Sequence, residues 1–228
     1  MKTIILLHGA MGAEIQLQPL QRLLQGSYKV HTLNFSGHGG NPFLKSFSIQ
    51  DFANEIVSFC EAHQLNEVHL FGYSMGGYVA LYLARHYPHL VTSVITFATK
   101  LIWDKTIAAK EVSMLQPDII ELKVPAFAER LQEIHSPNDW KILMKITNQM
   151  LTQMGERNPL QVEDFRFIKA PVLLMLGDGD KMVSLDETIT LFKHLPKVQL
   201  LVIPGTPHAI DQVDVEILAF HINKFIEK

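Results

Sequence analysis

Residues 68–77, which read VHLFGYSMGG, decide the fold of this 228-residue chain. The first six of them form a short apolar run typical of a buried strand, and a helical pattern follows from Met75 to His86. The only G-x-S-x-G in the chain, Gly72 to Gly76, therefore lies where a strand turns into a helix. A turn this sharp leaves no room for side chains beside the serine. We expect Ser74 to be held in a strained backbone conformation, with its hydroxyl exposed at the carboxyl edge of a sheet.

Strand-like runs recur along most of the chain and alternate with longer helical patterns, as in parallel sheets built from βαβ units. The predicted strands are Thr3–Leu7, Lys29–Leu33, Val68–Tyr73, Val94–Phe97, Val172–Leu176 and Gln199–Ile203. The predicted helices are Gln16–Leu24, Ile49–His63, Met75–His86, Leu185–Leu195 and Val213–Ile226. Most of the strands lack polar alternation, which indicates that helices cover both faces of the sheet. The sequence therefore predicts an α/β fold, a doubly wound and mainly parallel sheet of about six strands.

One segment departs from this alternation. From residue 104 to residue 164 no strand-like run occurs, and helical periodicity dominates. We predict an inserted helical cap, or lid, over residues 104–164, and an α/β core made of residues 1–103 and 165–228. Four methionines and both tryptophans lie in or beside the cap: Met114, Met144, Met150, Met154, Trp103 and Trp140. These side chains either pack the cap against itself or face a ligand, since methionine adapts to irregular apolar shapes.

The composition argues against several classes of protein. Lys and Arg number 20 against 23 Asp and Glu, a formal charge of −3 without a basic block, so a nucleic-acid partner is not expected. Cys60 is the only cysteine, which excludes an intramolecular disulfide and a cysteine metal cluster. The longest apolar stretch, Met75–Ala84, is about half as long as a bilayer-spanning helix, and the run at residues 4–7 is too short for a signal-peptide core. We expect a cytoplasmic protein without membrane insertion, of an oligomeric state that the composition does not fix.

The serine of the G-x-S-x-G turn needs two partners to act as a nucleophile. A hydroxyl becomes reactive when a base takes its proton, and a third group holds that base in the right tautomer. Asp178 and Asp180 follow the strand predicted at Val172–Leu176, and His208 follows the strand predicted at Gln199–Ile203. Both turns belong to the carboxyl edge, where ligand sites of parallel sheets lie. The residues thus supply a base, His208, and two candidate acids.

With these motifs in place, the chain resembles the α/β-hydrolase superfamily over nearly its whole length. Leu7-His8-Gly9-Ala10 matches the strand and His-Gly element of that family, and the stretch from Asn34 to Gly39, NFSGHG, matches its D-x-x-G-H-G turn. The elbow around the serine, the acid turn and the histidine loop follow in the family's order. Asn34 replaces an aspartate at a structural position of the family's turn. The chain begins close to the His-Gly strand, so we expect a compact version of the fold without the family's early antiparallel strands.

The resemblance implies a role for each site residue. Ser74 would be the nucleophile and His208 the base; the family's G-x-x-D spacing selects Asp180 as the acid and leaves Asp178 as a turn-forming residue. The oxyanion hole would be the backbone N–H groups of Ala10 and Met75. Neither a metal nor a cofactor is required by this chemistry.

We therefore expect a serine hydrolase that cleaves a small carboxylic ester or a related acyl substrate through an acyl-enzyme. Two alternatives stay open. A carbon–carbon lyase type of menaquinone biosynthesis resembles the chain in its elbow, GYSMGG, but typically has an arginine next, where this chain has Tyr78. A ligand-binding receptor on a hydrolase scaffold is the other, because a fold does not fix a function.

The remaining histidines are expected to be structural. His8 and His38 lie near the expected site, where we predict hydrogen-bonded loop histidines and not groups that transfer a proton. His86 and His89 are spaced as H-x-x-H, yet no further ligands accompany them, so metal binding is not expected there.

Overall fold

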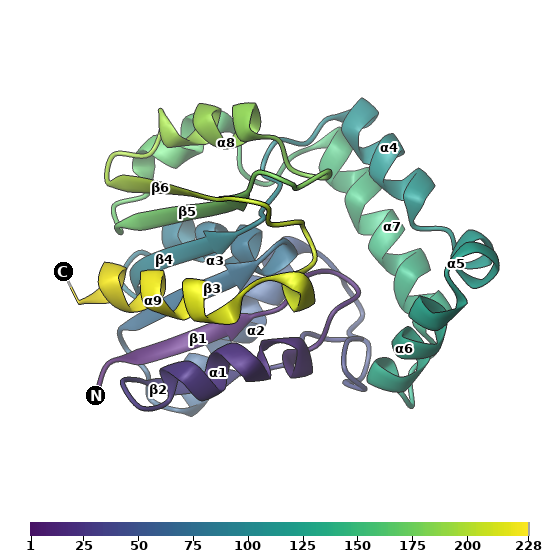
Figure 1. Ribbon diagram of the computed structural model, residues 1–228, viewed down its shortest axis with the longest axis horizontal. Helices are drawn as coiled ribbons and strands as arrows, with labels where there is room; N and C mark the ends of the chain where they lie inside the picture. Colours follow the sequence, from purple (N-terminus) through teal and green to yellow (C-terminus); the bar gives the residue numbers. More distant parts are fainter. Residues whose placement is uncertain (228) are drawn as a thin grey trace.

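The computed structural model describes residues 1–227 and contains a six-stranded parallel sheet (Figure 1). The strands are β1 (Thr3–Leu7), β2 (Lys29–Thr32), β3 (Val68–Tyr73), β4 (Val91–Phe97), β5 (Val172–Gly177) and β6 (Val198–Ile203). Their order across the sheet is β2-β1-β3-β4-β5-β6, and every neighbouring pair is parallel. All the strands therefore end at the same edge of the sheet. The predicted doubly wound sheet of six strands is confirmed.

Strand β4 begins three residues before its predicted start, at Val91 and not at Val94. Val68 and His69 on β3 pair with Val91 and Ser93, so Thr92 is left out of the ladder as a bulge. Thr92 is exposed between buried neighbours. This polar residue interrupts the apolar run from which the sequence predicts the strand.

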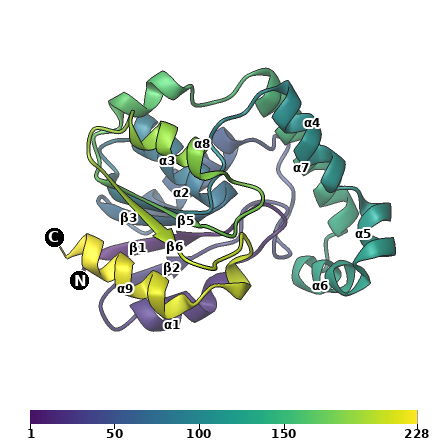
Figure 2. The ribbon, with the colours of Figure 1, turned by 45° about the horizontal axis from the view of Figure 1, so that its top comes forward.

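Helices cover both faces of the sheet (Figures 1 and 2). The structure contains α1 (Gln18–Leu24), α2 (Ile49–Ala62), α3 (Met75–His86), α8 (Leu185–Phe192) and α9 (Val215–Ile226) around the sheet. α1 and α9 share one hydrophobic cluster, which includes Ile4 and Leu6 of β1. α2, α3 and α8 share the cluster on the other face, which includes Ile5 and Leu7. Alternate side chains of one strand thus enter opposite cores, as a sheet covered on both faces requires.

The first predicted helix is divided into two elements. Residues Glu14–Leu17 form a 3-10 turn, and α1 follows from Gln18. Pro19 lies in the first turn of α1, where a residue without an N–H group loses no helical hydrogen bond. The proline therefore favours a new helix start at this point.

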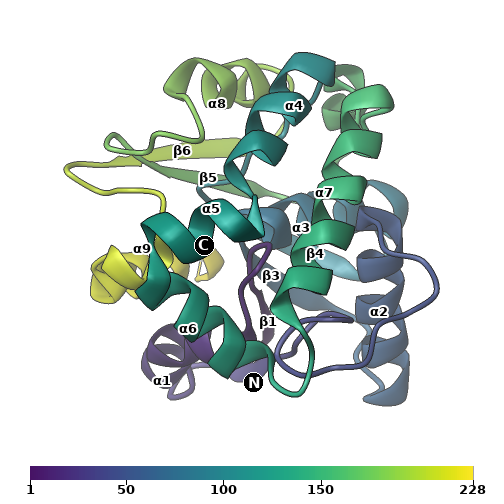
Figure 3. The same ribbon diagram turned by 90° about the vertical axis from the view of Figure 1, so that its right-hand side faces the viewer.

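Four helices are inserted between β4 and β5: α4 (Lys105–Met114), α5 (Pro117–Lys123), α6 (Pro125–His135) and α7 (Trp140–Glu156). A 3-10 segment, Val162–Phe167, leads back to β5. The four helices lie beyond the edge at which the strands end, with α4 alongside α7 (Figures 1 and 3). The N-terminus and the end of α9 lie at the opposite end of the sheet (Figure 1). The segment is as helical as predicted, and its role as a cap over residues 104–164 stays a prediction.

The methionines and tryptophans of the insertion do not share one role. Trp140 and Met144 pack with Leu131 and Leu143 inside the inserted helices. Met150 and Met154 join the main core instead and also line the cavity described below. Met114 is 46% exposed. Trp140 and Met144 thus pack within the insertion, whereas Met150 and Met154 also face a cavity, and a ligand contact of these two side chains stays a prediction.

Candidate active site

The turn between β3 and α3 holds Ser74 in a strained conformation. Its φ of 51° and ψ of −117° lie in a region that side-chain-bearing residues rarely adopt. The Ser74 N–H donates to the carbonyl of Phe97 on β4 at 2.9 Å, which fixes the turn to the sheet. A Cβ on Gly72 would overlap the backbone of Gly76, and one on Gly76 would overlap the carbonyl of Leu7. Glycine is therefore required on both sides of the serine, as the motif predicts.

Asp180 and His208 meet at the carboxyl edge. Asp180 lies in the turn after β5 and His208 in the loop after β6, and His208 Nδ1 lies 2.8 Å from Asp180 Oδ2. Asp180 Oδ1 accepts hydrogen bonds from the N–H groups of Met182 and Val183 at 2.7 and 2.9 Å. Burial alone raises the pKa of Asp180, but the bonds from His208, Val183 and Met182 outweigh it and hold this pKa below its usual value. An ionised Asp180 accepts from Nδ1–H, which leaves Nε2 of His208 as an acceptor.

Asp178, the other candidate acid, has a different partner. Its Oδ1 accepts a hydrogen bond from the N–H of Gly205 at 2.6 Å, and the residue is exposed. The bond ties the turn after β5 to the loop after β6. The structure thus brings Asp180 to His208 and leaves Asp178 as a link between two turns.

Ser74 and His208 line one cavity of about 230 Å³. Ala10 and Met75 line it as well, and the inserted helices contribute apolar side chains that include Leu115, Phe127, Met150 and Met154. Among the described residues no hydrogen bond joins Ser74 Oγ to His208. Catalytic hydrogen bonds of this kind often form only when a substrate binds. The predicted nucleophile, Ser74, and the predicted base, His208, therefore line the same cavity.

Two backbone N–H groups beside Ser74 are suited to binding an oxyanion. Met75 is the first residue of α3, so its N–H has no acceptor within the helix. Ala10 lies in the loop after β1, where a Cβ on Gly9 would come within 3.2 Å of Ser74 Cβ. Because Gly9 has no side chain, this loop can approach the serine closely. Both predicted donors therefore border the cavity of Ser74.

Three buried histidines, His8, His38 and His135, lie close together near the loop after β1. His8 Nδ1–H donates to the carbonyl of Gly9 at 2.8 Å, and its Nε2 accepts from the N–H of Phe35 at 3.2 Å. His38 Nδ1–H donates to the carbonyl of Ser36 at 3.0 Å. Burial lowers the pKa of His8 to about 4 and that of His38 well below its usual value. Both residues are hydrogen-bonded structural groups, as the sequence predicts.

The third of these histidines, His135 at the end of α6, was not singled out from the sequence. Its Nε2–H donates to the carbonyl of Met11 at 3.1 Å, and its Nδ1 accepts from the N–H of Gly39 at 3.0 Å. Its ring lies 5.9 Å from that of His38. His135 joins the inserted helices to the loop beside Ser74, and no sequence pattern signals this contact.

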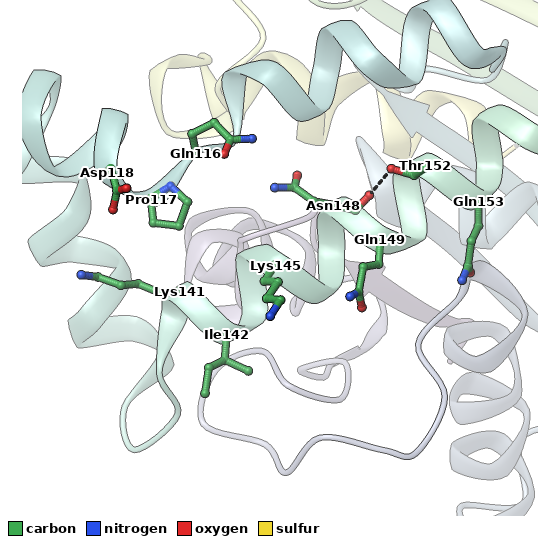
Figure 4. Close-up of a pocket in the computed structure, with 10 residues that line it drawn as sticks. All are labelled: Gln116, Pro117, Asp118, Lys141, Ile142, Lys145, Asn148, Gln149, Thr152 and Gln153. Carbon is green, nitrogen blue, oxygen red and sulfur yellow. Dashed lines mark hydrogen bonds between the residues drawn. The ribbon is translucent and has the colours of Figure 1, made fainter.

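A larger hollow, of about 870 Å³, lies on the outside of α7 (Figure 4). Figure 4 shows Lys145, Gln149 and Gln153 along α7, and Thr152 donating to the carbonyl of Asn148 at 2.8 Å. None of the predicted site residues lines it. The smaller cavity beside Ser74 is therefore the candidate active site.

No metal-binding group or membrane span is found in residues 1–227. In this range no group of three or more His, Cys, Asp or Glu side chains is placed so that it could hold a metal ion. The rings of His86 and His89 contact those of Tyr82 and Tyr87, with centroids 4.2 and 6.5 Å apart. Over the same range no helix is both long enough and apolar enough to cross a bilayer.

Comparison with known proteins identifies the family. The model of the alpha/beta hydrolase fold family matches residues 2–131, which include the elbow at Ser74. The chain belongs to this family. The resemblance drawn from the motifs is thereby confirmed, and so is the prediction that the protein is an enzyme.

Relatives of similar length are known by sequence and by structure. A 2-(acetamidomethylene)succinate hydrolase of Mesorhizobium japonicum is 25% identical over 98% of this chain and 87% of its own. A pimeloyl-[acyl-carrier protein] methyl ester esterase of Neisseria meningitidis is 28% identical over 99% of this chain and 93% of its own. The structure of a thermophilic esterase from Thermogutta terrifontis superposes with a TM-score of 0.81 at 18% identity, covering 100% of this chain and 90% of that one.

Proposed function

We propose that the protein is a serine hydrolase that cleaves a small carboxylic ester or a related acyl substrate through a Ser74, His208 and Asp180 triad. The observation that carries this proposal is the 2.8 Å bond between His208 Nδ1 and Asp180 Oδ2, at the cavity that Ser74 also lines. It supports the proposal because a base with a fixed tautomer beside a serine on a strained elbow is what acyl transfer requires.

The reaction follows from the protonation states of the three groups. Ser74 Oγ attacks the acyl carbon while Nε2 of His208 takes its proton, and the N–H groups of Ala10 and Met75 bind the oxyanion that forms. Protonated His208 then gives this proton to the leaving-group oxygen, and the acyl group stays on Ser74 as an ester. Water attacks this ester with the same base and the same oxyanion donors, which releases the acid. Asp180 stays ionised and stabilises the charged ring throughout.

The cavity argues for a small substrate. Its volume of about 230 Å³ is below the range of roughly 300–1,000 Å³ typical of sites for drug-sized ligands. The lining supplied by the inserted helices is mainly apolar, so a short hydrocarbon group gains by entering it. Two relatives are named as esterases, one of them for a methyl ester, which agrees with a small leaving group.

The lyase alternative loses support at Tyr78. Its hydroxyl accepts a hydrogen bond from the N–H of Leu160 at 2.9 Å and donates to Asn158 Oδ1. Burial raises its pKa far above the usual value, so the hydroxyl stays neutral. Tyr78 therefore offers no charge to a substrate carboxylate where the lyase type has an arginine.

The test is repeated turnover of simple esters. We expect the wild type to hydrolyse p-nitrophenyl acetate and butyrate many times per chain, and Ser74→Ala to lose about 10³-fold or more in kcat. Ser58→Ala, an exposed serine on α2, is the matched control and should keep wild-type kcat. If the folded wild type does not turn over ester, the proposal fails; a ligand that then raises the Tm without being cleaved would point to a receptor.

The proposal also covers partners and location. The partner is a small-molecule acyl substrate. The cytoplasmic location and the lack of a nucleic-acid partner stay predictions from charge and apolar patterning.

A further inference from the structure

Two charged side chains line the otherwise apolar cavity beside Ser74. Lys100 follows β4 and Glu111 lies on α4, and both border the cavity that Ser74 and His208 line. Glu111 is only 4% exposed. A buried charge is costly unless it is paired and hydrogen-bonded. Packing alone therefore does not explain why a carboxylate and an ammonium group face this cavity.

The pairing of these two groups is incomplete. Lys100 Nζ lies 3.7 Å from Glu111 Oε1 and 3.6 Å from Glu187 Oε2, within the range of an ion pair but too far for a hydrogen bond. Glu187 is satisfied on its other side, because its Oε1 accepts from the N–H groups of Leu101 and Ile102 at 2.8 and 2.9 Å. Glu111 makes no hydrogen bond among the described residues, and its carboxylate is not sealed off from the cavity. Glu111 and Lys100 thus have hydrogen-bonding capacity left for a ligand.

The charge of the cluster decides which ligand group fits. Lys100, Glu111 and Glu187 sum to −1. A second hollow that Lys100 and Glu187 also line is balanced, since its lining has three lysines and three carboxylates with these two residues included. A carboxylate brought to this end of the cavity would add to the negative excess. An ammonium group would reduce that excess, but it would be repelled by Lys100 Nζ and could accept no hydrogen bond from it. A neutral group with both an acceptor and a donor satisfies both residues: its oxygen accepts from Lys100 Nζ, and its O–H or N–H donates to Glu111.

We propose that Lys100 and Glu111 form a subsite that selects acyl substrates carrying a hydroxyl or carboxamide group away from the scissile bond, and that it disfavours a carboxylate there. This inference rests on the proposed esterase function and adds its specificity. Glu187 is a positioning residue, because it holds Lys100 through its own anchored carboxylate. A subsite of this kind explains why one cap carboxylate is buried in an apolar hollow.

The experiment compares methyl esters of straight-chain acids that differ only at the far end. For each of several chain lengths the end is a methyl group, a hydroxyl, a carboxamide or a carboxylate, and hydrolysis is followed in a pH-stat. At the best chain length, we expect kcat/KM of the hydroxyl or carboxamide ester to exceed that of the methyl-ended ester by about tenfold or more, because each bond has a charged partner. The carboxylate-ended ester should fall below the methyl-ended one.

Variants separate recognition from a structural role. In Glu111→Leu the ratio of kcat/KM between the polar and methyl ends should fall to near one, and in Glu111→Gln, which keeps an acceptor, it should recover in part. Glu121→Gln is the matched control: Glu121 also pairs with a lysine, Lys141, but both side chains are more than 40% exposed and lie outside the cavity. It should keep every ratio at the wild-type value.

Three outcomes would overturn the inference. A wild type that hydrolyses methyl-ended esters without preference for a polar end contradicts the subsite and leaves the esterase proposal standing. Equal loss on all esters in Glu111→Leu, with the ratios unchanged, shows a structural role only. Absence of turnover on every ester overturns the proposed function and this inference with it.

Discussion

Exchanging Asp180 for asparagine tests the assignment of the acid in atomic detail. Asp180 Oδ1 accepts from the N–H groups of Met182 and Val183 at 2.7 and 2.9 Å, and an asparagine keeps these bonds by placing its amide oxygen there. Its NH₂ group then faces Nδ1 of His208, in place of the Oδ2 that lies 2.8 Å away. Since an NH₂ group only donates, Nδ1 must accept, and the ring proton moves to Nε2. His208 can then no longer take the proton of Ser74.

The expected loss is large because it removes the base and not one hydrogen bond. The wrong tautomer in such triads typically costs about 10⁴ in kcat, which corresponds to about 5 kcal/mol of activation free energy. The assay is kcat for p-nitrophenyl butyrate, with the Tm of each variant as the check on folding. Asp178→Asn is the matched control, since its amide oxygen still accepts from the N–H of Gly205, and it should lose less than about tenfold. A greater loss in Asp178→Asn than in Asp180→Asn would contradict the assignment of Asp180 and move the acid role to Asp178.

Three further predictions concern the base, the elbow and acid stability. His208→Ala should lower ester turnover by about 10³-fold or more at an unchanged Tm; near-normal kcat would exclude His208 as the base. Gly76→Ala should lower the free energy of unfolding in urea by about 2 kcal/mol or more, because its Cβ would overlap the Leu7 carbonyl. Gly26 has open space around it, so Gly26→Ala should change this free energy by less than about 0.5 kcal/mol. Similar effects of the two substitutions would contradict the steric argument. Between pH 6.5 and about 4, unfolded His8 binds a proton that folded His8 does not, so stability should fall as the pH is lowered, by on the order of 2 kcal/mol at pH 5. A urea midpoint no lower at pH 5 than at pH 7.5 would contradict the lowered pKa.

The sequence predicts those features that short-range pattern controls. The strands around Leu70 and Leu174 are continuous apolar runs, and the glycines around Ser74 follow from the steric demands of one turn. The choice between Asp178 and Asp180 came from the family's spacing, and the structure places Asp180 at His208. The start of β4 was not predicted, because the exposed residue Thr92 at the bulge interrupts the apolar run of the strand.

Side-chain contacts around the inserted helices could not be predicted. Lys100, Glu111 and Glu187 come from a loop, from the inserted helix α4 and from α8, and each alone resembles a surface charge. His135 lies far along the chain from Gly39 and Met11, which it joins. Such contacts depend on how the inserted helices are placed against the sheet, and periodicity carries no information about that placement.

Covalent labelling with a fluorophosphonate, read by intact mass and peptide mapping, shows directly whether Ser74 is an activated nucleophile. An activated serine reacts with this probe, whereas an ordinary hydroxyl does not. We expect one label per chain, on the peptide that contains Ser74, and no label on Ser74→Ala. A folded wild type that stays unlabelled, or that carries its label on another peptide, would contradict the claim that Ser74 is the nucleophile.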